Sequence, residues 1–161
     1  MRTHRIVLIA ALAALALTGS AFGQSAHSSA ATTVVTTKST SYGTILVTSS
    51  GVALYLNSGD KTGHPACTGS CLSNWPPLKA SGATKASGAA KASLLGAVKI
   101  AGGVKQVTYN GHPLYTFPSD SKSHPTTGEG VNGFYVVSPG GTKITKSPTV
   151  KKKPPSTTPG Y

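Results

Sequence analysis

The sequence predicts a small all-β protein in which two tandem hairpin-based repeats pack as one domain. The main reason is an internal repeat, because residues 47–65 and 107–125 align without a gap at an offset of 60, with eight of nineteen positions identical. In addition, each copy contains two short apolar runs separated by turn residues, which is typical of a hairpin. Trp75 and Tyr135 are also 60 residues apart, so we expect the repeat to extend beyond this motif.

Residues 1–23 have the pattern of a secretion signal. Arg2 and Arg5 precede an apolar run, residues 6–17, that is too short to cross a bilayer as a helix. Small residues at 21 and 23 predict cleavage after Gly23. Residues 17–20 are similar to a bacterial lipobox, but serine stands where the lipid-bearing cysteine belongs. We therefore expect a secreted, extracytoplasmic protein with no transmembrane segment after signal removal; an uncleaved signal anchor is the alternative.

The two-repeat β domain is expected at residues 42–145, after a disordered leader, 24–41, in which only a short strand at 33–37 is suggested. Repeat one, residues 43–78, contains strand-like runs at 44–48 and 52–56 around the turn residues 49–51. A polar loop, residues 57–65, follows this hairpin.

Residues 79–93 form a low-complexity insert, because Lys79-Ala-Ser-Gly-Ala-Thr is nearly repeated from Lys85. With a glycine in each copy and almost no apolar stripe, it is expected to be a flexible linker. Repeat two, residues 94–145, has Asn110-Gly111 as a two-residue hairpin turn and a returning strand at 133–138. Pro113 lacks an N–H and predicts an edge strand. Residues 146–161 read as a disordered, basic, proline-rich tail.

Cys67 and Cys71 are the two cysteines of the chain, and export would place them in an oxidising compartment. A disulfide between them is the favoured interpretation. The alternative is a metal site made by both thiolates and His64, which would suit a soft ion.

Several short segments of repeat one together resemble a known protein family. Leu-Tyr at 54–55, Asp60, Cys-Thr-Gly-Ser-Cys at 67–71 and Trp-Pro-Pro-Leu at 75–78 resemble a bacterial secreted-repeat family marked by a Tyr-x-(Phe/Trp/Tyr)-x-x-Asp motif. The second copy matches at Tyr115, Phe117 and Asp120, whereas the first keeps Tyr55 and Asp60 but has Asn57 in the middle position. The resemblance covers residues 43–141, with Tyr135 where a tryptophan often stands. It implies a fold and a location outside the cytoplasm, but no biochemical function.

The motif residues themselves suggest structural roles. Asp60 to Gly63 fits a type I turn in which the carboxylate accepts backbone N–H groups, and Asp120 can act in the same way. Binding of a ligand or cation by these aspartates is the alternative. Tyr55 and Tyr115 are expected in strands, with the ring inward and the hydroxyl at the rim.

Three histidines are candidate metal ligands. His64 and His124 each precede a proline, which favours a loop, and His112 follows the Asn-Gly turn. Solvated histidines are the simpler expectation, but copper or zinc binding stays open. A metal-binding or redox-associated protein is therefore the alternative function.

The charge of the chain favours anionic partners. Removing the signal leaves 13 lysines against Asp60, Asp120 and Glu129, a net charge of +10. Lysine without arginine favours diffuse attraction to cell-wall polymer or lipid headgroups over recognition of nucleic acid. The alternative is that the charge serves only solubility. No enzyme or cofactor is expected. Residues 58–61 and 61–63 match the Ser-x-x-Lys and Lys-Thr-Gly motifs of penicillin-binding enzymes, but here the two motifs overlap in one loop, whereas that chemistry needs them on separate elements around a pocket. Weak hydrolase activity is the third functional hypothesis.

Overall fold

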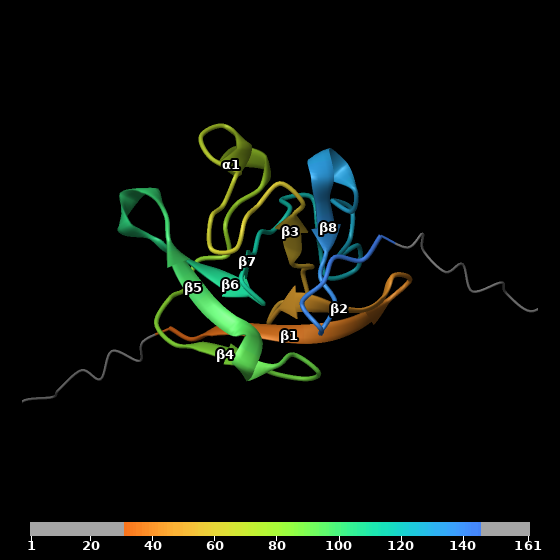
Figure 1. Cartoon of the computed structure of the whole chain (residues 1–161). Coiled ribbons are helices and arrows are strands. Elements are labelled where there is room, and N and C mark those ends of the chain that lie inside the picture. Colours follow the sequence, from red (N-terminus) through yellow and green to blue (C-terminus); the bar gives the residue numbers. More distant parts are fainter. Residues whose placement is uncertain (1–30, 146–161) are drawn as a thin grey trace, which may run out of the picture.

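The computed structural model describes residues 31–145, which form short strands in three small sheets (Figure 1). One sheet has the order β2-β1-β4, the second is the pair β3-β8, and the third has the order β5-β6-β7. The signal, the start of the leader and the tail lie outside the described residues. The expected all-β class is confirmed. The strands are β1 (Thr33–Thr40), β2 (Gly43–Thr48), β3 (Tyr55–Asn57), β4 (Thr84–Ala86), β5 (Leu95–Lys99), β6 (Lys105–Tyr109), β7 (His112–Pro113) and β8 (Phe134–Val136).

Helical structure in the described residues is limited to single turns. They are α1 (Cys71–Asn74) and the 3-10 turns η1 (Ala92–Leu94), η2 (Ala101–Gly103) and η3 (Val131–Gly133). Each has three or four residues, so none can bury an amphipathic face of its own.

Each repeat begins with an antiparallel strand pair, β1–β2 in the first and β5–β6 in the second, so repeat one starts before the expected residue 43. The second strand then turns back on itself. In repeat two the turn is Asn110-Gly111, with φ of 50° and 79°, as the Asn-Gly pair predicts. Pro113 lies in β7 at the edge of its sheet, so its missing N–H costs no ladder bond there.

The corresponding turn of repeat one has one more residue. Leu54 N–H donates to Leu46 C=O, whereas Leu114 N–H donates to Val107 C=O. Leu54 and Leu114 are 60 apart, but Leu46 and Val107 are 61 apart. The gapless alignment is therefore wrong on the N-terminal side of the turn, where Gly51 with φ of 84° absorbs the extra residue.

The last extended segment of each repeat pairs with the hairpin of the other repeat. β8, from repeat two, pairs with β3, with Val136 opposite Tyr55. The segment 76–80, from repeat one, lies along repeat two, where Leu78 N–H donates to Leu114 C=O and Val107 N–H donates to Leu78 C=O. The repeats thus exchange their final segments and complete each other's sheets.

Two segments expected to be largely disordered belong to the fold, although the short strand suggested at 33–37 is confirmed as part of β1. β1 is a strand of eight residues in the expected leader, antiparallel to β2. β4 lies in the expected flexible insert and pairs in parallel with β1 (Figure 1). Threonine side chains hold this insert, since Ser81 N–H donates to Thr33 Oγ1 and Ala89 N–H donates to Thr37 Oγ1. An open strand edge can order a segment with little apolar character through backbone hydrogen bonds.

The core consists of two adjoining clusters that both combine residues of the two repeats. Trp75, Phe134 and Tyr115 belong to the first, and Leu46, Val107 and Tyr109 to the second. Trp75 corresponds in structure to Phe134 rather than to Tyr135, because Pro77 pairs with Tyr115 as Val136 pairs with Tyr55. The expected correspondence of Trp75 and Tyr135 is therefore wrong by one residue.

Candidate functional site

The motif tyrosine of each repeat binds the motif aspartate of the other repeat. Tyr55 Oη donates to Asp120 Oδ2 at 2.6 Å, and Tyr115 Oη donates to Asp60 Oδ1 at 3.3 Å. Both rings are fully buried. Burial and the neighbouring carboxylate raise the pKa of both tyrosines far above the usual range, so both hydroxyls stay protonated donors. The structure brings these four residues together across the repeats.

The aspartates also fix the loops that follow them. Asp60 Oδ1 accepts the N–H of Ala66, and Asp120 Oδ1 accepts both the N–H and the hydroxyl of Thr127. The turn after Asp60 spans residues 61–64, where Lys61 and His64 exchange backbone hydrogen bonds, not residues 60–63 as expected. Each carboxylate therefore spans a loop rather than caps the adjacent turn.

An aromatic cluster lies behind the motif. Trp75 stacks on Phe134, with ring centroids 3.8 Å apart and planes 6° apart, and contacts Phe117 and Tyr55 at 4.7 and 5.2 Å. Phe117, the middle aromatic of the second motif copy, is thus a packing residue. A Cβ on Gly128 would lie 2.8 Å from Trp75 and from Phe117, so the loop can approach the rings this closely only with glycine.

The two aspartates differ in how fully they are satisfied. Asp120 uses both oxygens, whereas Asp60 Oδ2 is buried without a hydrogen-bond partner. His112 Nδ1 is also buried without a partner, and both residues line a pocket of about 290 Å³ together with Asn110 and Lys143. Burial raises the pKa of Asp60 against the lowering effect of its hydrogen bonds.

Glu129 has a role that no sequence motif indicates. Its Oε2 accepts the N–H of Val136 at 2.6 Å, next to the point where β8 pairs with β3. Burial raises the pKa of Glu129. It is the one glutamate of the chain, and that scarcity is the only signal in the sequence that marks it.

Cys67 and Cys71 form a disulfide, with Cα atoms 5.4 Å apart, in the turn that leads into α1. The thiolates of the alternative metal site are therefore used in this bond. Among the histidines, His64 and His124 are exposed in loops and His112 is half-buried. Within residues 31–145, no group of three or more metal-ligating side chains comes together.

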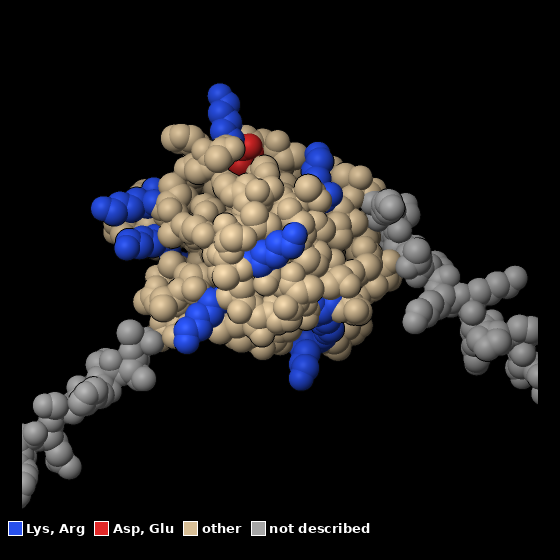
Figure 2. All heavy atoms as spheres, turned by 60° about the horizontal axis from the view of Figure 1, so that its bottom comes forward, with Lys and Arg blue, Asp and Glu red and all other residues tan. Residues whose placement is uncertain are grey.

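The outer surface carries most of the charge. Eight of the nine lysines between residues 31 and 145 are exposed, and Lys38 is half-buried. Figure 2 shows lysines projecting from all sides of one face, with acidic atoms visible only in a small area near its upper edge. The acids are few there because Asp60, Asp120 and Glu129 are all half-buried and bonded internally.

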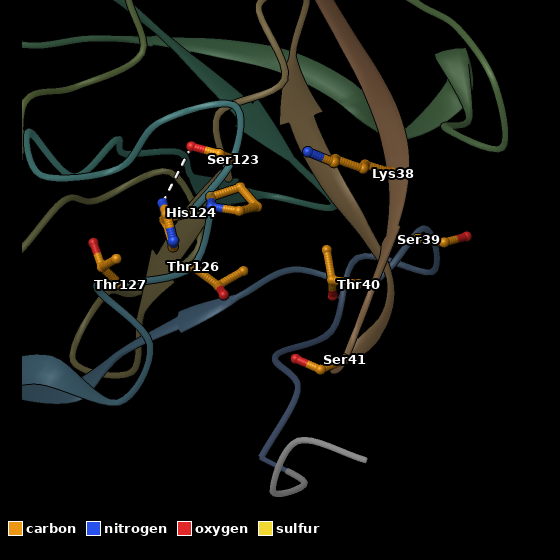
Figure 3. A pocket seen from close by; sticks show the side chains of 9 residues that line it. Lys38, Ser39, Thr40, Ser41, Ser123, His124, Thr126 and Thr127 are labelled. Carbon is orange, nitrogen blue, oxygen red and sulfur yellow. Dashed lines mark hydrogen bonds between the residues drawn. The ribbon is translucent and has the colours of Figure 1, made fainter. Parts of the chain in front are cut away.

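A groove of about 370 Å³ lined by hydroxyl groups lies on the surface between β1 and the loop that follows Asp120. Lys38 and Thr40 lie on one side, and Ser123, His124 and Thr126 on the other (Figure 3). In this groove a lysine, an imidazole and several hydroxyls converge without a carboxylate among the lining residues.

Comparisons with known proteins identify the family. No curated protein and no solved structure matches the chain. No helix within residues 31–145 has the length and apolar character needed to cross a membrane. A family model described as a secreted repeat of unknown function matches residues 36–79 and 96–137, together more than half of the chain. The chain therefore belongs to this family of secreted repeats and is an extracytoplasmic protein.

Proposed function

We propose that this secreted protein is a non-enzymatic binder of an anionic cell-envelope polymer. The observation that carries the proposal is the separation of its charges. The described carboxylates are held inside the fold, while the lysines project outward. An anionic polymer therefore meets cationic groups with little competition from acidic side chains.

The motif residues support this division of roles. Tyr55, Asp120, Tyr115 and Asp60 hold the two repeats together, so they are occupied by the fold. Their tyrosine hydroxyls are poor candidates for proton transfer, because burial keeps them protonated. This arrangement favours a scaffold that presents its surface over a catalytic site.

Lysine suits a repetitive, flexible partner. Its ammonium is a point charge on a flexible stem, without the planar geometry that lets arginine recognise one phosphate or carboxylate in a fixed orientation. Lysines spread over a surface attract a chain of like charges in many registers. An anionic wall polymer has this character.

The test is binding of the secreted protein to an isolated anionic wall polymer and to a neutral polysaccharide over a series of salt concentrations. Binding to the anionic polymer should fall steeply with salt, because screening shortens electrostatic reach to about 8 Å at physiological ionic strength. Anionic vesicles form a further arm, and a clear preference for them would shift the partner to lipid headgroups. Binding that ignores salt would refute the proposal.

A matched comparison locates the main contact. Deleting residues 146–161 removes four lysines and takes the charge of the chain after signal removal from +10 to +6. Replacing Lys79, Lys85, Lys91 and Lys122 by glutamine removes the same charge from the folded part. If the tail is the main contact, the deletion weakens binding more than the four substitutions do.

A further inference from the structure

The groove beside β1 is built from both repeats. One side is the end of β1 and the following turn, residues 38–41, and the other is the segment 123–127 of repeat two. In Figure 3, Lys38 and Thr40 lie along the β1 side, while the hydroxyl of Ser39 points away. The alternation of side chains along a strand accounts for this, since residues two apart share a face.

The lining offers hydrogen-bond donors and positive charge. It holds the ammonium of Lys38, the imidazole of His124 and the hydroxyls of several serines and threonines, and no carboxylate is among the lining residues. The nearest motif acid, Asp120, has both oxygens engaged by Tyr55 and Thr127. The groove therefore suits an anion that also carries hydroxyl groups.

Internal contacts hold both sides of the groove in place. Lys38 Nζ donates to Lys122 C=O at 2.6 Å, which joins β1 to the loop. Ala53 N–H donates to Pro125 C=O, and Thr127 is held by Asp120. A preorganised site loses less conformational entropy when it binds. The Tyr-Asp motif thus shapes this wall of the groove.

The equivalent strand of the second repeat, β5, lacks the lysine and threonine that line the groove. Thr37 faces Leu46 in the β1–β2 pair, and Ala97 faces Val107 in the β5–β6 pair. Since Leu46 and Val107 correspond, Val98 stands in place of Lys38 and Ile100 in place of Thr40. The fold alone does not require lysine and threonine at these positions.

We propose that this groove binds an oxyanion group, phosphodiester or carboxylate, of a hydroxylated envelope polymer. Lys38 supplies the charge, the ring N–H of His124 donates, and the hydroxyl of Thr126 donates to the anion or accepts from polymer hydroxyls. The hydroxyl of Thr40 donates to Gly43 C=O, so towards the polymer it acts only as an acceptor. The inference rests on the proposed function and names the place where the polymer is held. The exposed lysines elsewhere would then add salt-dependent attraction without selecting a group.

The test follows backbone amide signals of the full secreted protein by NMR during titration with glycerol phosphate, glucuronate and glucose. Saturable shifts at residues 38–41 and 123–127 are expected with one of the two anions and not with glucose. A response to glycerol phosphate alone identifies a phosphate group, the oxyanion that a phosphodiester polymer carries, and a response to glucuronate alone identifies carboxylate. Equal shifts with glucose would overturn recognition of an anion.

Two variants and a matched control test whether the anion binds in the groove. Lys38→Gln and His124→Gln should each weaken binding of the responsive anion about tenfold, the expected loss of a charge-assisted hydrogen bond. Lys85→Gln removes an exposed lysine from β4, outside the groove, and should change affinity less than about twofold. Glutamine at 38 retains a donor for Lys122 C=O, and an unchanged melting temperature checks the fold.

The outcomes separate this inference from the proposed function. If polymer binding depends on salt but Lys38→Gln and Lys85→Gln weaken it equally, the groove inference fails and the proposed function stands. If the protein ignores the anionic polymer but glycerol phosphate still shifts the groove amides, the proposed function fails and the anion site stands. If neither the polymer nor any small anion binds, both are wrong.

Discussion

Tyr55 and Tyr115 meet at the centre of the molecule, where the backbone N–H of each donates to the carbonyl of the other at 3.0 and 2.9 Å. They are equivalent residues of the two repeats, so this contact relates the repeats by an internal twofold. From it, each side chain reaches the aspartate of the opposite repeat. The motif that marks the sequence therefore joins the two repeats, and we call its two hydrogen bonds, Tyr55–Asp120 and Tyr115–Asp60, the inter-repeat clasp.

The clasp should be asymmetric in strength. Tyr55→Phe leaves Asp120 Oδ2 without its 2.6 Å donor and should lower the free energy of unfolding by about 1.5–3 kcal/mol. Tyr115→Phe breaks a bond of 3.3 Å and should cost only about 1 kcal/mol. Urea denaturation followed by fluorescence of Trp75 measures both. Tyr135→Phe, on the half-buried Tyr135, is the control, and a larger loss for it than for Tyr55→Phe would contradict the clasp.

Stability should fall, not rise, as the carboxyls ionise. Burial raises the folded-state pKa of Asp60 above its usual 3.8 and that of Glu129 above its usual 4.5. A raised folded pKa stabilises the fold fully below the unfolded pKa, and the contribution is lost as pH rises through the folded value. Unfolding free energies measured from about pH 3 to about pH 7 should show this decline. Asp60→Asn with Glu129→Gln should flatten it, and an unchanged slope would refute the assignment.

The disulfide should contribute moderate stability because it closes a short loop. Reduction, or replacement of Cys67 and Cys71 by serine, should lower the unfolding free energy by about 2 kcal/mol. Alkylation without reductant should leave both cysteines unlabelled, with two labels added after reduction. Free thiols in freshly secreted protein would contradict the bond.

Neither repeat should fold alone. A fragment of residues 31–80 lacks β8, so the backbone groups of β3 lose their partner strand. Circular dichroism should show a disordered chain, and mixing with residues 81–145 should restore the sheet signal. A sharp independent melting transition of the first fragment would show that the exchanged segments are dispensable.

Much of the local structure could be predicted from residue chemistry. Asn110-Gly111 gave the two-residue turn because both positions need positive φ, a requirement that depends on few neighbours. The strands at 44–48 and near 106–109 followed from β-rich composition, and the motif, its repeat and the cysteine pair were visible without structure. Such signals lie within a few residues of one another.

Which residues and strands pair with one another was decided only by the tertiary structure. Because both repeats carry the same tyrosine and aspartate, the sequence could not distinguish a bond within a repeat from one between repeats. β4 could not be foreseen either, since Thr84, Lys85 and Ala86 become a strand only where β1 offers an open edge. Likewise Phe134, not Tyr135, faces Trp75 because loops of unequal length shift the second repeat by one residue, and a one-residue shift along a strand exchanges its buried and exposed faces.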